Sequence, residues 1–310
     1  MFKISSLTRR VGKKIESLPL RKRLMLEKVV DLLLIIRTIK DIRRYRNLLR
    51  AVETTTFEVK PDQGFAKFDV PNLDPCIFIE FANTLKNEYL QRGSINQKNS
   101  KEYLQQIANL ETIAKKNEII EFALSGSILK SVANYFGKYP ILHDISVFYS
   151  PANAHLQTSE KKFQGSQLFH RDGGGTRCLK LWILCEDVSS DNGPTTLLPA
   201  DISDAVCERL KYTPGKKFET DEPLNNVLSY SIKLIGKAGD WFATDTDRCL
   251  HYGSRTKKES SRLVMMFHFV DRNSLYYLPL IRNRYFKRYT DLNLNNSNFP
   301  IYSKDAIRFR

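Results

Sequence analysis

Three residues that lie far apart in the sequence carry side chains suited to holding a metal ion: His170, Asp172 and His251. His170 and Asp172 are separated by one residue within the segment 167–172, whose pattern is typical of a β-strand. Because side chains alternate along a strand, we expect both to point to the same face. Two imidazoles and one carboxylate can hold an ion from one side and leave its other coordination positions open. The sequence therefore predicts a metal centre that reactants can reach directly.

A His-x-Asp pair alone is weak evidence, since many histidines are only hydrogen-bonded core residues. His170-Arg171-Asp172 also resembles the catalytic loop of protein kinases. That interpretation fails because no Gly-rich loop and Lys-bearing strand precede the tripeptide and no Asp-Phe-Gly follows it. A cupin-type metal site is disfavoured as well, because the chain has no His-x-His pair. Two histidines and one carboxylate are typical of the facial triad of non-haem Fe(II) oxygenases.

The elements that must position these residues change in kind at Pro140. Before it, the patterns predict helices at residues 22–50, 77–91, 101–115 and 117–136. After it, they predict short strands at residues 141–149, 167–172, 178–185, 195–198, 228–234, 239–244 and 262–270. Turn residues rich in Gly, Asn and Pro separate the strands. This order predicts an α+β fold in which a helical layer covers a β-sandwich or barrel.

The composition is that of a globular protein. Of the 310 residues, 42% are hydrophobic and 27% are charged, which excludes wholesale disorder. The five cysteines are widely spaced and include no Cys-x-x-Cys pair, which disfavours a disulfide framework or a structural zinc site and favours a reducing compartment. No apolar run approaches the roughly 20 residues that a membrane span needs.

The net charge of +15 is concentrated at the two ends of the chain. Residues 1–50 carry a net charge of +11 and residues 281–310 carry +5, which leaves −1 for the region between them. We therefore predict three parts: a basic helical extension at 1–50, a main domain at 51–280 and a basic tail at 281–310. The extension either packs on the main domain by its apolar stripe or docks on an anionic membrane or partner. The predicted location is cytoplasmic, with peripheral membrane contact as an option.

Between about residues 117 and 270, the order of motifs resembles the phytanoyl-CoA dioxygenase family of Fe(II)- and 2-oxoglutarate-dependent oxygenases. The matching segments are Tyr135-Phe136-Gly137, the strand at 145–149, Gln167-Leu168-Phe169-His170-Arg171-Asp172, Leu181-Trp182-Ile183-Leu184, Asn192-Gly193-Pro194, Leu198-Pro199, Ala238-Gly239-Asp240, His251 and Arg262. The resemblance implies a double-stranded β-helix, or jelly roll, flanked by helices.

The resemblance also implies roles for individual residues. His170, Asp172 and His251 would bind Fe(II), and Arg262 would bind the C5 carboxylate of 2-oxoglutarate. An arginine suits that task because its fork binds a carboxylate through two parallel hydrogen bonds. Two further residues are candidate contacts to the co-substrate: Trp182, whose alternative is a plain core tryptophan, and Gln167.

The implied reaction is hydroxylation of a small-molecule or carrier- or CoA-linked substrate by O2, with release of succinate and CO2. The carboxylate of Asp172 favours hydroxylation, desaturation or ring formation over halogenation. The chain departs from the family at Leu198-Pro199-Ala200-Asp201 and at residues 251–256, which affects the walls of the pocket and hence the substrate. Residues 201–226 are a candidate lid, with Lys211, Lys216 and Lys217 as candidate contacts to an anionic group.

Other interpretations remain open at this stage. The chain could be a non-catalytic jelly-roll binding protein that its basic ends bring to a membrane, glycan or nucleic acid. Demethylation of nucleic acid is disfavoured because the main domain has no excess of basic residues. The remaining histidines, His143, His155 and His268, are predicted to be structural, with a contact to lid or substrate as the alternative for His155.

Overall fold

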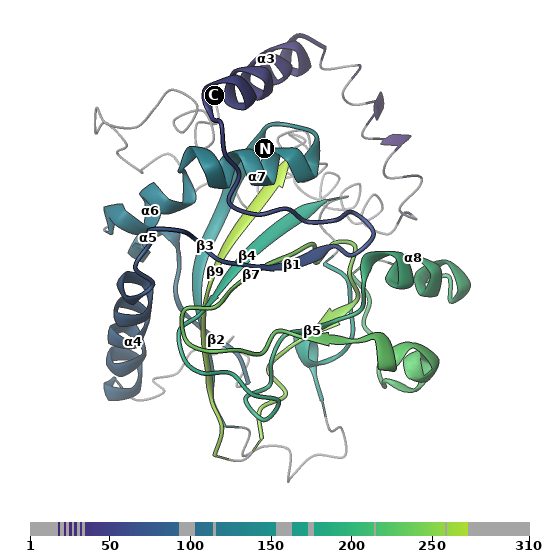
Figure 1. Cartoon of the computed structure of the whole chain (residues 1–310). Helices are drawn as coiled ribbons and strands as arrows, with labels where there is room; N and C mark the ends of the chain where they lie inside the picture. The colour runs from purple at the N-terminus through teal and green to yellow at the C-terminus, as the bar shows by residue number, and fades with distance from the viewer. Residues whose placement is uncertain are drawn as a thin grey trace, which may run out of the picture.

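The computed structural model describes residues 35–92, 103–113, 116–152, 163–172, 177–213, 215–257 and 259–271, together with isolated residues between 18 and 32. His155, the predicted tail at 281–310 and most of the first 34 residues lie outside the described residues. The described chain forms helices and two antiparallel sheets (Figure 1). The predicted mixture of helices with antiparallel sheet is therefore confirmed.

A six-stranded antiparallel sheet forms the centre of the molecule, in the order β1-β7-β4-β9-β3-β2. Its strands are β1 (Phe65–Phe68), β2 (Gln105–Ala108), β3 (Pro140–Ser150), β4 (Cys178–Leu184), β7 (Trp241–Thr244) and β9 (Arg262–Asp271). Side chains alternate along β9: Leu263 and Phe267 lie in the main hydrophobic core, whereas Arg262 and Met266 line a cavity on the opposite face. One strand thus supplies both the core and the candidate site.

A second, smaller sheet faces this cavity. It consists of β6 (Ile232–Lys233), β5 (Thr196–Leu197) and β8 (His251–Tyr252), and His170 adds to its edge through a bridge to His251. From β3 to β9 the chain passes repeatedly between the two sheets, as the strands of a double-sheet jelly roll do. The strands of the smaller sheet pair over only two residues each, so the two sheets do not close into a barrel.

Helices cover the outer face of the large sheet. They include α4 (Cys76–Gln91), α6 (Asn117–Ala123) and α7 (Gly126–Phe136) (Figure 1). The aromatic rings of Phe78, Phe122 and Trp241 meet in this layer, with centroids 5.2 Å apart for Phe78–Trp241 and 4.6 Å apart for Phe122–Trp241. Burying such a side chain contributes about 1.5–3 kcal/mol, so this cluster gives the sheet a rigid backing.

On the far side of the molecule, α8 (Ala200–Arg209) and the 3-10 helix η3 (Glu222–Tyr230) cover the smaller sheet. Their apolar side chains form a separate cluster with Phe169, Leu198 and Leu250. Phe169 and Leu250 directly precede His170 and His251 in the sequence. The cluster therefore fixes the two backbone segments from which the histidines project.

The helix predicted at 117–136 is two helices, α6 and α7. Ser125 adopts an extended conformation, with φ −61° and ψ 147°, and so separates them. The second helix ends before Gly137, as predicted, because this glycine takes the left-handed conformation that closes a helix. Lys116 is the N-cap residue of α6, and no side chain donates or accepts a capping hydrogen bond there.

The prediction of a helix at residues 101–115 was wrong. This segment contains the edge strand β2 and the single turn α5 (Leu110–Ile113), because Gln105 and Gln106 pair with Tyr149 and Phe148 of β3. Two strand predictions also need correction. Residues 167–172 contain the end of the 3-10 helix η2 (Gly165–Gln167) and two isolated bridges of His170, to Lys217 and to His251, and residues 228–230 belong to η3 rather than to a strand.

The described part of the basic extension includes helix α3 (Ile35–Ala51), which contacts α7. Leu48 is fully buried in the main core and Tyr45 packs against that core. Val29, an apolar residue of the predicted extension, is 50% exposed. Among the described residues, no helix combines the length and the apolar character needed to cross a bilayer.

Candidate metal centre and its pocket

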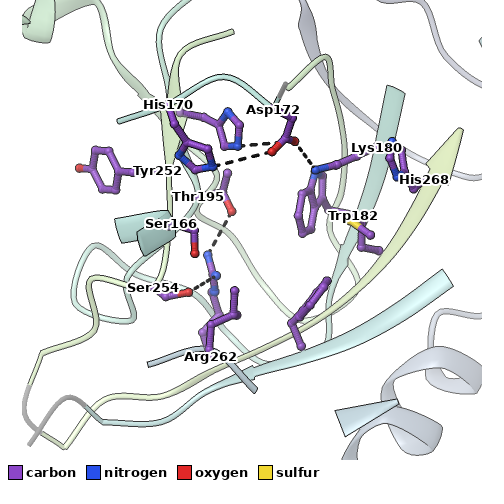
Figure 2. A pocket seen from close by; sticks show the side chains of 15 residues that line it. Ser166, His170, Asp172, Lys180, Trp182, Thr195, Tyr252, Ser254, Arg262 and His268 are labelled. Carbon is purple, nitrogen blue, oxygen red and sulfur yellow. Dashed lines mark hydrogen bonds and ion pairs between the residues drawn. The ribbon is translucent and has the colours of Figure 1, made fainter. Parts of the chain in front are cut away.

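A cavity of about 250 Å³ lies between the two sheets. His170, Asp172, His251 and Arg262 all line it, and so does Trp182 (Figure 2). The histidines come from the smaller sheet, whereas Trp182 on β4 and Arg262 on β9 come from the large one. The structure thus brings five of the six predicted site residues to one cavity.

The two histidines and Asp172 converge on one point. One ligand atom from each of the three lies within 4.8 Å of the other two. The Nε2 atoms of His170 and His251 lie 3.7 and 3.9 Å from the Oδ1 and Oδ2 atoms of Asp172. Two reciprocal backbone hydrogen bonds of 2.9 Å join His170 to His251, and the backbone N–H of Asp172 donates to the carbonyl of Thr246. Backbone pairing therefore sets this geometry.

Both imidazoles present a free lone pair to the centre. The Nδ1 of His170 bonds the carbonyl of Leu168 at 2.8 Å, and the Nδ1 of His251 bonds the carbonyl of Cys249 at 3.0 Å. A carbonyl oxygen only accepts, so each Nδ1 carries the proton and each Nε2 is unprotonated in the neutral ring. Burial lowers the pKa of His170, and burial together with His170 lowers that of His251 to about 3. Neutral imidazoles with Nε2 facing a carboxylate fit a divalent metal.

Asp172 has a second partner that the sequence reasoning did not identify. The ammonium of Lys180 on β4 lies 2.5 Å from Oδ2 of Asp172, and the Lys180 side chain is only 14% exposed. Although burial alone would raise the pKa of Asp172, Lys180 and the two imidazoles hold it well below its ordinary value. Asp172 is therefore an anion at neutral pH, as a metal ligand must be.

Arg262 is a buried cation whose hydrogen-bond partners are neutral. Its two terminal nitrogens donate to the hydroxyl oxygens of Thr195 and Ser254, each at 3.1 Å, and its Nε has no partner. The residue is 4% exposed, and burial lowers its pKa to about 10. A buried guanidinium without a carboxylate partner is costly, so this position suits an anionic group of a ligand.

Trp182 and Gln167, the two remaining candidates, differ in their surroundings. The indole N–H of Trp182 donates to Thr244 at 2.8 Å while its ring lines the cavity. Gln167 is 2% exposed, donates to the carbonyl of Ser254 at 2.8 Å and accepts from the backbone of Gln164. It is not among the described residues that line the cavity. Its hydrogen bond to the carbonyl of Ser254 fixes the backbone of that residue, whose hydroxyl accepts from Arg262.

The segment 201–226, the candidate lid, contributes none of the described residues that line the cavity. It is fastened instead to the loop that follows His251. Arg255 makes two hydrogen bonds to Asp221, of 2.5 and 2.8 Å, donates to the carbonyl of Gln167 at 2.7 Å, and lies 3.5 Å from the ring centre of Tyr252. These contacts tie the segment to both histidine-bearing stretches.

Lys180, Thr195, Ser254 and His268 line the cavity although the sequence reasoning assigned them no role in it. A signal for Lys180 was present, because it is the single charged residue in the apolar strand at 178–184. It also lies two residues before Trp182, which places both side chains on one face of the strand. His268, predicted to be structural, shares the cavity face of β9 with Arg262 and Met266.

Comparisons with known proteins give only distant likenesses. No protein-family model matches the sequence, and neither does any curated protein. Among solved structures, EctD from S. alaskensis with bound Fe has a TM-score of 0.46 at 13% identity, covering 68% of this chain and 73% of that one.

Two other solved structures are similar to a comparable degree. The epimerase SnoN, in complex with Fe3+, alpha ketoglutarate and nogalamycin RO, has a TM-score of 0.43 at 15% identity, covering 68% of this chain and 80% of that one. AviO1 from Streptomyces viridochromogenes Tue57 has a TM-score of 0.44 at 15% identity, covering 69% and 92%. At these scores the likenesses carry no inference about activity, which has to come from the site.

Proposed function

We propose that this chain is a non-haem Fe(II)- and 2-oxoglutarate-dependent oxygenase with a jelly-roll core, of the kind that the phytanoyl-CoA dioxygenase family represents. One observation carries the proposal. Two neutral imidazoles and an ionised carboxylate meet at one side of a cavity that also holds a buried arginine without an anionic partner. The three ligands suit Fe(II), and the arginine suits the distal carboxylate of 2-oxoglutarate.

In this proposal each residue of the cavity has a distinct task. His170, Asp172 and His251 hold the metal on one side, while Arg262 holds the far end of 2-oxoglutarate and so fixes its orientation. The ring of Trp182 forms a wall beside the co-substrate and keeps water out. Bound iron and 2-oxoglutarate together supply the activation of O2 needed to hydroxylate a C–H bond, with succinate and CO2 as by-products. The substrate is a small molecule, free or linked to a carrier or CoA.

The proposal is tested on the purified full chain by two measurements. The first is Mn(II) binding, followed by electron paramagnetic resonance, with and without 2-oxoglutarate. The second is succinate release with Fe(II), O2 and a library of small molecules. We expect Asp172→Ala and His251→Ala to weaken Mn(II) binding at least 10-fold and to reduce succinate release at least 100-fold, because each removes a ligand.

Asp191→Asn provides the matched control, since Asp191 is an exposed carboxylate that pairs with Lys257 at the surface. This variant should behave like the wild type in both measurements. If the wild type binds Mn(II) and 2-oxoglutarate but no library compound raises succinate release above the basal rate, the non-catalytic binding role is favoured. If it binds neither, the proposed cofactors are wrong.

We also propose that the basic N-terminal extension, residues 1–50, docks the chain on an anionic membrane surface. Its residues Met25, Val29 and Leu32 are 50–69% exposed, and Ile39 and Ile42 are 44% and 43% exposed. Exposed cationic side chains accompany these apolar ones at Lys22, Lys28, Lys40, Arg43 and Arg46. Exposed apolar side chains accompanied by cations fit a bilayer interface containing anionic lipid.

Co-sedimentation of the full chain with lipid vesicles tests this docking. We expect binding to vesicles that contain phosphatidylserine and little binding to vesicles of phosphatidylcholine alone. The double variant Val29→Glu, Leu32→Glu should lose at least five-fold in binding. Ile235→Glu is the control, because Ile235 is 46% exposed on the main domain. Equal binding to both vesicles, or an unchanged double variant, would contradict the proposal.

A further inference from the structure

Lys180 brings a second positive charge to the cavity besides that of Arg262, and it also keeps Asp172 ionised. It stands in the middle of β4 between apolar neighbours, and its ammonium bonds Asp172 at 2.5 Å. An ammonium has three N–H donors, and this bond uses one of them. Figure 2 shows Lys180 on the side of Asp172 that faces away from the two histidines. Two donors therefore remain for another group in the cavity.

The charges that line the cavity do not balance. Among the described lining residues, Asp172 is the single anion, whereas Lys180 and Arg262 are cations, so the lining carries a net charge of +1. Divalent iron and the dianion of 2-oxoglutarate cancel each other. The charges of the lining side chains, iron and 2-oxoglutarate then add to +1, while buried Asp247 acts on Lys180 from behind the lining. Burying an unbalanced charge is costly, and a monoanionic ligand would remove that cost.

His268 offers a further polar group at the same place. It is the direct cross-strand partner of Lys180 in the pairing of β4 with β9. Its Nε2 is buried and has no hydrogen-bond partner, although the side chain lines the cavity. Buried polar groups are nearly always satisfied, so a hydrogen bond from a ligand to Nε2 would stabilise binding at this place. Lys180 and His268 thus form a paired binding position.

This position is separate from the one proposed for 2-oxoglutarate. His268 and Arg262 lie six residues apart on β9, which corresponds to about 20 Å of extended strand. In Figure 2, Lys180 and His268 lie together, with Trp182 between them and Arg262. Trp182 pairs across the strands with Met266, and Phe148 also lines the cavity. Apolar walls therefore separate the two cationic positions.

We propose that the primary substrate is a small carboxylic acid with an apolar body, whose carboxylate binds between Lys180 and His268 while its body packs on Trp182 and Met266. This inference rests on the proposed function and names its substrate class. A carboxylate is favoured over a phosphate ester because it carries one negative charge, which matches the excess of +1, whereas a phosphate ester carries nearly two at neutral pH.

The test uses the full chain loaded with Mn(II) and saturating 2-oxoglutarate, so that binding is measured without turnover. The probes are cyclohexanecarboxylate and its neutral analogue cyclohexanecarboxamide, and the readout is Mn(II)-induced broadening of the probe's proton NMR signals. We expect the carboxylate to bind at least 10-fold more tightly than the amide. Lys180→Met should remove this preference, and His268→Gln, which leaves the metal ligands and their partners untouched, should reduce it about three-fold or more.

Lys233→Met is the matched control, because Lys233 is an exposed lysine on β6 outside the cavity lining, and it should keep the full preference. Mn(II) and 2-oxoglutarate affinities are measured first for the wild type and every variant. If the wild type binds neither, the proposed function is wrong, and the substrate class is not what failed. Two results overturn the substrate class: equal binding of carboxylate and amide, or tighter binding of cyclohexyl phosphate.

Discussion

At the scale of single residues, Arg262 shows a conflict between stability and binding. Its guanidinium is 4% exposed and its hydrogen-bond partners are two hydroxyl groups. We expect Arg262→Met, which keeps the length of the side chain, to raise the free energy of unfolding of the ligand-free protein by about 1–3 kcal/mol. The same variant should lose at least 10-fold in 2-oxoglutarate affinity while it keeps Mn(II) affinity. Urea unfolding and calorimetric titration measure the two effects.

The stability gain of Arg262→Met depends on pH through the pKa of Arg262, which burial lowers to about 10 in the folded state. Between neutral pH and pH 9 the group is charged in both the folded and the unfolded chain, so the cost of burying it stays constant. It falls only as the pH rises past about 10, where the folded form loses its proton first. The stability gain of Arg262→Met should therefore be constant from pH 7 to 9. If Arg262→Met is less stable than the wild type, the guanidinium of Arg262 is well solvated in the folded protein and this expectation is wrong.

The residues of the site could be predicted from sequence only as far as chemical type and spacing reveal them. His170, Asp172, His251 and Arg262 were predicted, and they meet in one cavity. Lys180 was missed because its importance depends on what lies opposite it, and strand pairing decides that. His268 was taken as structural because a histidine inside an apolar strand gives no indication of which face borders a cavity.

At the scale of elements, two glycines with the same backbone conformation allow a matched comparison. Gly193 and Gly137 both have φ of +64°, but a Cβ on Gly193 would lie 2.5 Å from the backbone nitrogen of Thr256, whereas one on Gly137 would meet nothing within 4 Å. We expect Gly137→Ala to lose about 1 kcal/mol of stability and Gly193→Ala about 3 kcal/mol or more. Chemical unfolding of both variants measures the difference, and equal losses would contradict it.

Sequence patterns predicted the central strands and helix α4 well, but they missed the edge strand β2 and the break between α6 and α7. β3, β4 and β9 agree with their predicted ranges to within one or two residues, because buried strands are marked by apolar runs between turns. The edge strand β2 was predicted as a helix, since its residues form a strand only through pairing with β3. The break at Ser125 was missed because both flanking helices keep a continuous apolar pattern.

At the scale of the whole molecule, the candidate site draws its residues from both sheets. The metal ligands belong to the smaller sheet and its edge, whereas Arg262 belongs to the large sheet. The smaller sheet is held by strands that pair over two residues each. A ligand that reaches from the metal to Arg262 would therefore connect the sheets, and its binding energy would add to the stability of the folded chain.

We accordingly expect Mn(II) and 2-oxoglutarate together to raise the melting temperature more than Mn(II) alone. At ligand concentrations about 100-fold above the dissociation constant, binding adds about 2.7 kcal/mol. For a domain of this size that corresponds to roughly 5–10 °C in a thermal unfolding scan. Removing the metal with a chelator should abolish the contribution of 2-oxoglutarate, because its chelating end then has no partner. In Arg262→Met, 2-oxoglutarate should add little to the effect of Mn(II). A full 2-oxoglutarate shift in that variant would mean that the co-substrate does not span the two sheets.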